Sequence, residues 1–301
     1  MKNYKEYFSE RNFSDIRYNE PLKNHTSFKV GGPADVMVIP TSEEELIDAV
    51  KICRDNDLKY FIMGNGSNLL IKDTGIRGVV IRINEGFDTV VVKDAKIVAN
   101  AGALLTAVSK IALRESLEGM EFASGIPGTI GGAITMNAGA YGGEMKDVVS
   151  SVRVLTKDNQ ILDLTNDEMD FAYRNSKVKE LDLIVISVEI DLSHGDFDTI
   201  DEKIKELTFQ RTSKQPLELP SGGSTFKRPE GYFAGKLIDD AGLRGLRHGD
   251  AQVSEKHCGF VVNRGNTSYK EIMELVGVIQ KTVMDKFGVE LEMEIKRVGD
   301  D

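Results

Sequence analysis

The chain has 301 residues, of which 41% are hydrophobic and 29% are charged, and its formal net charge is −10. This length exceeds one average domain and this composition is ordinary for a globular protein, so we expect two or three domains. The acidic balance argues against non-specific nucleic-acid binding. The chain has no Trp and only 7% aromatic residues, so we do not expect a base-stacking nucleic-acid surface either.

The cysteines, histidines and apolar runs exclude further classes of protein. Cys53 and Cys258 have neither metal-type nor redox-type spacing, and Cys53 is expected to be a buried free thiol. The four histidines form no ligand pattern, so no metal is expected. No apolar run approaches the roughly eighteen residues of a membrane span. The mixed-charge stretch at residues 1–13 does not resemble a signal peptide, so we expect a cytoplasmic protein without membrane contact.

In chain order, the first half of the sequence predicts short strands with a few helices. We expect a short polar helix within residues 1–20. The sequence Ser42-x-x-Glu45 resembles a capping box that opens a helix with an apolar face. Strands are expected at Val36–Pro40, Tyr60–Met63, Leu69–Ile71, Gly78–Ile83 and Thr89–Lys93.

The second half begins with a glycine-rich stretch. Residues 119–143 hold eight of the 29 glycines, which excludes a long regular helix there. Val149–Leu155 and Ile161–Leu164 predict a hairpin, and Leu183–Leu192 predicts another strand. Ser193–Asp198 is expected to be a turn, and Thr199–Thr212 a helix that marks the boundary of a second domain.

The C-terminal segment has the strongest local signals. Ser268 is expected to cap a helix that Gly288 ends. A strand at Val289–Ile295 is expected to place its apolar residues on one face and Glu290, Glu292 and Glu294 on the other. The whole pattern predicts an α+β fold.

Two glycine-rich loops point to a phosphorylated ligand. The first is GNGSN at Gly64–Asn68, and the second is SGIPGTIGGA at Ser124–Ala133. Neither standard phosphate motif is present, because Leu69 stands where a dinucleotide fingerprint needs its third glycine, and GYFAGKL at Gly231–Leu237 is one residue short of a P-loop. On its own GNGSN fits a polar hairpin turn equally well. Two such loops together favour a large phosphorylated cofactor, since bare backbone N–H groups suit a diphosphate.

Three polar residues stand apart as candidates for chemistry, and each also has an ordinary interpretation. Arg174 suits a carboxylate, or is a surface arginine. Ser224 follows a glycine pair and could be exposed in a cleft, or is a turn serine. Glu294 could transfer or share a proton, or belongs to a solvated strand face. A basic cluster could bind a substrate phosphate or form a solvated surface, and comprises Lys214, Lys227, Arg228, Lys236 and Arg244.

Taken together, nine motifs in order resemble the UDP-N-acetylenolpyruvoylglucosamine reductase family over nearly the whole chain. They are NHTSFKVGG (residues 24–32), GNGSN (64–68), GIPGTIGG (125–132), NAGAYGGE (137–144), YRNS (173–176), RTSKQP (211–216), GGSTFKRP (222–229), AGKLID (234–239) and EIKRVG (294–299). The short interval between Arg174 and Ser224 resembles the family's shorter subclass, which lacks a substrate-covering tyrosine loop.

The resemblance implies a two-subdomain FAD-binding module of the vanillyl-alcohol-oxidase type and a separate α+β substrate-binding domain. We expect the first FAD subdomain at residues 1–71, joined by a returning C-terminal strand at 295–301. The second FAD subdomain is expected at residues 72–205, and the substrate domain at residues 206–294. A monomer is expected.

The resemblance also assigns roles to residues. Arg174, Ser224 and Glu294 match the family's catalytic residues, with Ser224 as the proton donor. Substrate contacts are expected from Tyr173, Arg211, Lys214, Lys227, Arg228 and Arg244, although Arg228 stands where the longer subclass has an asparagine. Cofactor contacts are expected from Gly64, Asn65, Gly66, Ser67, Asn68, Gly125, Ile126, Pro127, Gly128, Thr129, Gly132, Asn137, Gly139 and Ala140.

The implied reaction is NADPH-dependent reduction of UDP-N-acetylglucosamine enolpyruvate through a non-covalently bound FAD. Arg174 would hold the developing enolate and Ser224 would protonate it. An ionised Glu294 would repel that enolate, so we expect Glu294 to act in its protonated form as a hydrogen-bond donor. The alternatives are an oxidase of alcohols or hydroxy acids on the same cofactor fold, and a non-catalytic nucleotide-binding protein.

Overall fold

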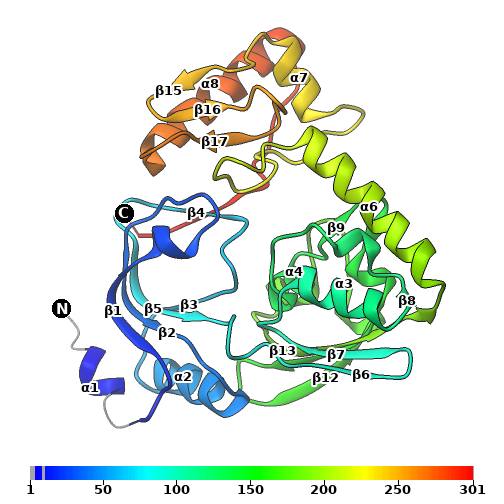
Figure 1. Cartoon of the computed structure of the whole chain (residues 1–301). Coiled ribbons are helices and arrows are strands. Elements are labelled where there is room, and N and C mark those ends of the chain that lie inside the picture. The colour runs from blue at the N-terminus through cyan, green and yellow to red at the C-terminus, as the bar shows by residue number, and fades with distance from the viewer. Residues whose placement is uncertain (1–3, 9–10, 301) are drawn as a thin grey trace. The chain divides into compact units, whose positions relative to one another are not determined.

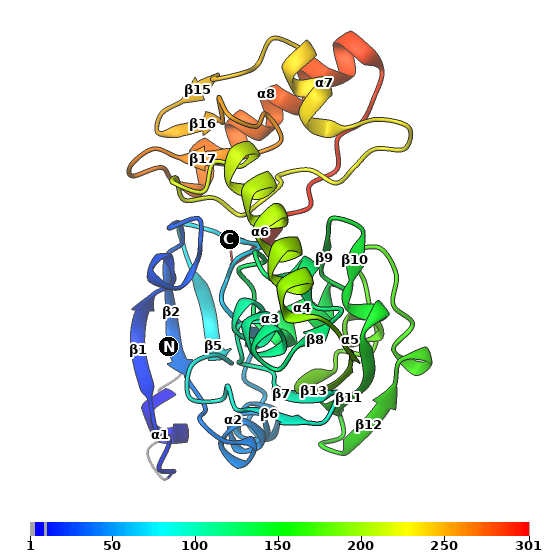
Figure 2. The same ribbon diagram turned by 45° about the vertical axis from the view of Figure 1, so that its right-hand side comes forward.

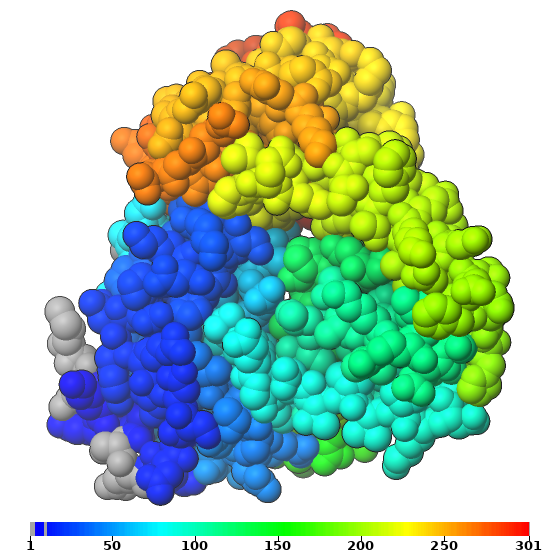
Figure 3. All heavy atoms as spheres, in the orientation of Figure 1, coloured from blue at the N-terminus to red at the C-terminus, as the bar shows by residue number. Residues whose placement is uncertain are grey.

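The computed structural model describes residues 4–8 and 11–300, which are coloured in Figures 1 and 3. The chain divides into two units, each described by itself below. Unit 1 comprises Met1–Arg17, Val36–Asn65 and Val79–Arg211, and unit 2 comprises Tyr18–Asp35, Gly66–Gly78 and Thr212–Asp301. Each unit encloses its own cluster of buried apolar side chains.

The helices are α1 (Tyr4–Phe8), α2 (Glu43–Asp55), α3 (Leu105–Arg114), α4 (Ile130–Thr135), α5 (Lys177–Glu180), α6 (Phe197–Lys214), α7 (Ala234–Asp240) and α8 (Tyr269–Phe287). The strands of the first half are β1 (Ile16–Pro21), β2 (Pro33–Val38), β3 (Tyr60–Met63), β4 (Leu69–Ile71), β5 (Ile76–Arg82), β6 (Val90–Lys93), β7 (Lys96–Asn100), β8 (Leu117–Glu118), β9 (Gly139–Ala140) and β10 (Gly143–Glu144). Those of the second half are β11 (Val149–Leu155), β12 (Ile161–Thr165), β13 (Ile184–Asp191), β14 (Ser193–His194), β15 (Arg247–His248), β16 (Ala251–Val253), β17 (Val261–Asn263) and β18 (Lys296–Val298).

Unit 1 is built around a five-stranded sheet in the order β12-β11-β13-β7-β6, whose described pairs are all antiparallel. Helices α3 and α4 lie on one face of this sheet (Figures 1 and 2). Their apolar residues Val108 and Ile134 share a buried core with Ile97 and Val188 of the sheet. In the same unit β3 runs parallel to the end of β5, from Tyr60 opposite Val79 to Met63 opposite Arg82.

Unit 2 is built from a small antiparallel sheet, β15-β16-β17, and helix α8 (Figure 1). Helix α8 begins at a capping box in which Ser268 and Glu271 each bond the other's backbone N–H, and it ends at Gly288 with φ +66°. Its buried face carries Ile279 and Val283, which join Val253 and Val261 of the sheet in the core. At the C-terminus β18 pairs in parallel with β4, Lys296 opposite Leu69.

The short helix expected within residues 1–20 is confirmed by α1, and residues 1–3 and 9–10 lie outside the described part. Two other predicted elements are wrong in part. Ser193–His194 is not a turn but β14, which pairs with β8. Residues 289–295 form no regular strand and make only a single bridge, at Met293, before β18 begins.

The other predicted elements are confirmed within a few residues. Strands β3 and β4 and helix α8 begin and end where the sequence indicated, and β11 and β12 form the expected antiparallel hairpin. Ser42 caps α2 by accepting the backbone N–H of Glu45 at 3.2 Å, whereas the Glu45 carboxylate bonds Thr41 and Ser14. Cys53 is buried and free. The α+β class is confirmed, and no helix in the described ranges is long and apolar enough to span a bilayer.

Candidate active site

The start of the first glycine loop touches the second glycine loop within unit 1. Asn65 Nδ2 donates a hydrogen bond to the carbonyl oxygen of Pro127 at 3.0 Å. A Cβ added at Gly64 would lie 2.2 Å from Thr129 Oγ1, so the Thr129 side chain or the loops would have to shift to admit it. The two loops therefore lie against each other, even though about 60 residues separate them.

The second loop is fixed to its own unit by backbone hydrogen bonds. The N–H groups of Ile130 and Gly131 both donate at 2.8 Å, to the carbonyls of Ala103 and Ala101, and Leu105 N–H donates to Gly128 O at 3.0 Å. A Cβ at Gly131 would lie 3.1 Å from the Cβ of Ala101, so this glycine serves packing against the end of β7. These bonds hold the loop against residues 101–105, with Pro127 exposed at its turn.

The end of the first loop belongs to unit 2 and is tied to the C-terminal segment there. Gly66 has φ +61°, and a Cβ on it would lie 2.2 Å from the carbonyl oxygen of His25. Asn68 Nδ2 donates to the carbonyl oxygen of Glu294 at 3.2 Å, and Asn68 O accepts from Lys296 N–H at 3.0 Å. No pattern in the sequence indicated that the side chain of Asn68 holds another part of the chain.

In NAGAYGGE the expected cofactor residue Asn137 is fully buried and its side chain is hydrogen-bonded throughout. Its Nδ2 donates to Glu144 Oε2 at 2.8 Å and to Ala172 O at 3.2 Å, while its Oδ1 accepts from Lys146 N–H at 3.0 Å. Both amide hydrogens are thus used within the protein. The Asn137 side chain therefore ties Glu144 and Lys146 to Ala172, and its amide hydrogens are not available to a ligand.

Arg174 stands at the tip of a tight turn in unit 1. Ala172 and Asn175 exchange two backbone hydrogen bonds, which leaves Tyr173 and Arg174 as the two turn residues. Arg174 has φ +54°, an uncommon value for a residue with a side chain. Its Nη1 donates to Gly139 O at 3.4 Å, its guanidinium lies 5.3 Å from the centre of the Tyr173 ring, and Tyr173 is 59% exposed.

Arg211, on α6, lies against the second glycine loop. A Cβ added at Gly125 would be 2.8 Å from Arg211 Cδ and 3.3 Å from its Nε. Burial lowers the pKa of the guanidinium, and no carboxylate in the described ranges forms an ion pair with it. A half-buried cation beside bare backbone is a favourable place for an anionic group.

Ser224 and Glu294 are held by one strand-like pairing within unit 2. Glu294 N–H donates to the carbonyl of Thr225 at 2.9 Å, and Phe226 bridges Met293 in antiparallel fashion. Gly222 leaves room for Ile295, whose Cδ1 would lie 2.9 Å from a Cβ there, and Gly223 turns the chain at φ +82°. Ser224 is consequently exposed and Glu294 half-buried. Arg174, the third predicted catalytic residue, belongs to unit 1.

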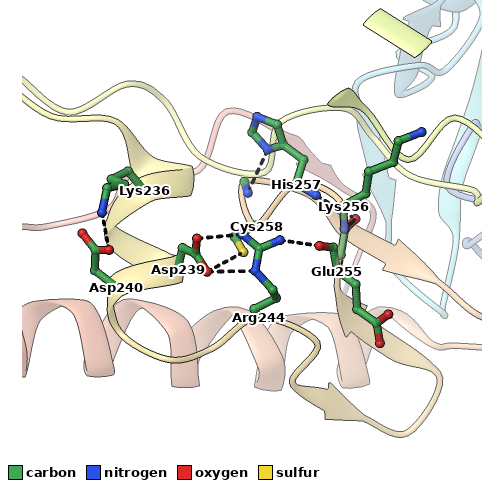
Figure 4. Close-up of polar contacts among 10 residues, drawn as sticks. Lys236, Asp239, Asp240, Arg244, Glu255, Lys256, His257 and Cys258 are labelled. Carbon is green, nitrogen blue, oxygen red and sulfur yellow. Dashed lines mark hydrogen bonds and ion pairs between the residues drawn. The ribbon is translucent and has the colours of Figure 1, made fainter. Parts of the chain in front are cut away.

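Three members of the predicted basic cluster are ion-paired with carboxylates. Arg244 binds both oxygens of Asp239, at 2.9 and 2.6 Å, and also donates to the carbonyl of Glu255 (Figure 4). Lys236 pairs with Asp240, and Lys227 pairs with Glu292. Arg228 instead stacks over the ring of Phe233 at 4.1 Å, and Phe233 is 62% exposed. Lys214 is exposed at the end of α6.

Two family models match the chain. Residues 34–165 match the FAD binding domain, and residues 215–298 match the C-terminal domain of UDP-N-acetylenolpyruvoylglucosamine reductase. The match to an FAD-binding domain identifies the bound group as FAD, and glycine-rich loops such as the two that adjoin here suit its diphosphate. The fold and site define an FAD-containing oxidoreductase.

The chain is similar along its whole length to curated UDP-N-acetylenolpyruvoylglucosamine reductases. It is 52% identical to that of Clostridioides difficile over 95% of this chain and 94% of the relative, and 54% identical to that of Caldanaerobacter subterraneus over 94% and 93%. The crystal structure of the reductase from Thermus caldophilus superposes with a TM-score of 0.80 at 36% identity, covering 94% of this chain and 98% of that one. The chain belongs to the UDP-N-acetylenolpyruvoylglucosamine reductase family, an enzyme family of peptidoglycan synthesis.

Proposed function

We propose that this chain reduces UDP-N-acetylglucosamine enolpyruvate to UDP-N-acetylmuramate with electrons from NADPH, and that Ser224 supplies the proton. The observation that carries the proposal is the pairing of residues 225–227 with residues 292–294, supported by family membership. This pairing holds a hydroxyl, Ser224, and a carboxyl, Glu294, on adjoining backbone although 70 positions separate them in sequence. Reduction of an enolpyruvyl double bond needs one such proton donor for each hydride added.

The cofactor would be held by the loops of unit 1. Backbone N–H groups of Gly64, Asn65, Gly125, Gly128 and Thr129 would line the FAD diphosphate, with Ile126 and Pro127 contacting it through their other atoms. Arg211 beside Gly125 would add positive charge. When bound, FAD supplies the two-electron chemistry that connects NADPH to the enolpyruvyl group. The remaining proposed cofactor contacts are Gly66, Ser67, Asn68, Gly132, Asn137, Gly139 and Ala140, with Asn137 acting through its backbone.

Arg174 would hold the carboxylate of the enolpyruvyl group. Its planar guanidinium matches a carboxylate and never loses its charge, so it stabilises the enolate that develops there. The left-handed backbone at Arg174 supports this role, because such strained positions persist only where the surrounding structure enforces them and gather at functional sites. Tyr173 next to it would contact the same substrate.

The sugar nucleotide would be bound by cations of unit 2. We propose Lys214, Lys227 and Arg228 as contacts for the diphosphate and the base, and exposed Phe233 beneath Arg228 is suited to stacking. Arg244 is a weaker candidate than the sequence suggested, because its guanidinium is occupied by Asp239 and Glu255.

An anaerobic experiment tests the reaction in two halves. NADPH should bleach the yellow flavin, and addition of the enolpyruvyl sugar nucleotide should restore its colour. In Ser224→Ala we expect normal bleaching but a recovery slowed by about 10²–10⁴-fold, as is typical when a positioned acid is removed. Slow bleaching with normal recovery in this variant would contradict the assignment of Ser224.

Glu294 is tested by two substitutions in the same assay. If Glu294 acts as a protonated hydrogen-bond donor, Glu294→Gln keeps a donor and should retain far more recovery rate than Glu294→Ala. Equal losses in the two variants would reject this role.

An oxidase with the same cofactor fold is distinguished by how the flavin is attached. A non-covalent flavin is released into the supernatant when the protein is denatured and precipitated, whereas a tethered flavin stays in the pellet. Release is expected here. Retention of the colour, together with reoxidation by oxygen but not by the sugar nucleotide, would favour the oxidase.

A further inference from the structure

Thr225 connects three segments of unit 2 and has no role in the reaction as described so far. It is fully buried, in contrast to its exposed neighbour Ser224. Its N–H donates to the carbonyl of Gly259 at 2.8 Å, and its own carbonyl accepts from Glu294 N–H at 2.9 Å. Its side-chain Oγ1 accepts from the N–H of Val261 at 2.9 Å. One residue thus holds the candidate proton donor, the Glu294 segment and the start of β17.

The segment that Thr225 bonds on one side is a firmly held turn. Within it Ser254 Oγ accepts the N–H groups of Lys256 and His257, and His257 Nδ1 accepts Gly259 N–H at 3.1 Å. Arg244 fixes the same turn from outside through the carbonyl of Glu255 (Figure 4). The acceptor and donor that Thr225 uses, Gly259 O and Val261 N–H, therefore occupy defined positions.

The segment on the other side is also held at more than one point. Lys227 N–H donates to Glu292 O at 2.8 Å, which continues the pairing beyond Phe226 and Met293. The backbone of Glu294 is bonded at both its polar groups, its N–H to Thr225 and its carbonyl to Asn68 Nδ2. Thr225 is where these two held segments meet, one residue from Ser224.

We propose that Thr225 is a positioning residue that sets the Ser224 hydroxyl and the Glu294 carboxyl for proton delivery, an inference that rests on the proposed function. Its backbone hydrogen bonds would form with any residue, but the bond from Val261 N–H requires a side-chain acceptor. A valine has nearly the same shape and leaves that buried N–H without a partner. The turn then shifts, and a displacement of about 1 Å at a reacting group slows its step by up to about 10²-fold.

The test compares Thr225→Val with Thr225→Ser, which keeps the hydroxyl. Thr267→Val is the matched control, because Thr267 is also buried in unit 2 and its Oγ1 donates to Glu271 at 3.0 Å. Each variant, loaded with FAD, is followed anaerobically through flavin reduction by NADPH and through reoxidation by the enolpyruvyl sugar nucleotide, in H2O and D2O. The melting temperature and the dissociation constant of the sugar nucleotide are measured in parallel.

In Thr225→Val we expect reoxidation to slow by about 10-fold or more, with a larger solvent isotope effect because the proton transfer has become limiting. Flavin reduction and sugar-nucleotide affinity should stay within about twofold of the parent, since neither depends on the orientation of Ser224. Thr225→Ser should recover most of the reoxidation rate. Thr267→Val should lower the melting temperature and leave both half-reactions intact.

A Thr225→Val protein that reoxidises at the parental rate, or that loses both half-reactions in proportion to its stability, overturns the positioning role. Should that variant not fold, Thr225→Cys takes its place with the same expected outcome, because a thiol is a poor acceptor. A parent protein that NADPH reduces but the sugar nucleotide does not reoxidise refutes the proposed function itself, so the two failures are told apart.

Discussion

Gly64→Ala tests whether the two glycine loops must meet without a side chain between them. The added Cβ would lie 2.2 Å from Thr129 Oγ1, and Cβ atoms essentially never approach another atom within 3.0 Å, so the two atoms must separate by at least about 0.8 Å (3.0 − 2.2). Thr129 is the N-cap of α4, where its Oγ1 accepts Gly132 N–H at 3.5 Å. The substitution therefore either rotates this cap away or pushes the loops apart.

The expected loss of stability in Gly64→Ala depends on which of these two rearrangements occurs. Losing the cap costs about 1 kcal/mol, and forcing the loops apart costs about 1–3 kcal/mol. The same displacement widens the surface proposed to line the diphosphate, so FAD affinity should fall by about 10-fold to 100-fold, at 1.4 kcal/mol for each factor of ten.

The assay is titration of the apoprotein with FAD, followed by flavin fluorescence, with melting temperature measured alongside. The double variant Gly64→Ala/Thr129→Ala lacks the clashing Thr129 Oγ1. Its loss of FAD affinity should therefore be smaller than the summed losses of the Gly64→Ala and Thr129→Ala single variants. Gly277→Ala is the control, since nothing lies within 4 Å of a Cβ there, inside α8. It should stabilise the protein by about 0.5–1 kcal/mol and leave FAD affinity unchanged. Unchanged FAD affinity in Gly64→Ala would refute the reasoning.

Three further outcomes are expected. Burial raises the pKa of the Cys53 thiol to about 12, so iodoacetamide at pH 8 should label Cys53 only after denaturation, as mass spectrometry would detect; labelling of the native protein would contradict its burial. Burial lowers the pKa of His257 below its ordinary 6.5, so the unfolded chain binds the proton more tightly than the folded protein does. The stability that this difference contributes is present above pH 6.5 and should be lost as the pH falls through the lowered pKa of the folded protein. The melting temperature should therefore fall less steeply over this pH window in His257→Gln than in the parent. Ser42→Ala removes the cap of α2 and should lower the free energy of unfolding by about 1 kcal/mol in a urea titration, whereas no change would indicate that Glu45 alone holds the helix start.

Much of the local structure could be predicted from neighbouring residues. Helix α8 was delimited by Ser268, Glu271 and Gly288, because a cap depends on hydrogen bonds that span only a few positions. The β11–β12 hairpin was predicted for the same reason, since its two strands are joined by a short turn. The strand predicted at residues 289–295 was wrong because alternation of apolar residues does not reveal whether a partner strand is available along its length.

For the candidate site, too, the sequence determined some features and left others to the tertiary structure. The sequence determined which residues could carry the chemistry, because the side-chain types of Arg174, Ser224 and Glu294 are fixed covalently. It also determined that glycine stands where the two loops need close backbone approach. It did not reveal that Thr225 and Arg244 hold other segments in place, because the motif around Thr225 and the basic cluster around Arg244 do not show which distant backbone groups these side chains bond.

Only the tertiary structure decided which distant segments meet. The first loop was predicted to act as one cradle, yet Asn65 bonds Pro127 whereas Asn68 bonds Glu294, more than 220 positions away. Likewise Thr225 joins Gly259, Val261 and Glu294. Such pairings depend on which backbone groups remain unpaired once each core has formed, and that balance is a property of the whole chain rather than of any stretch of its sequence.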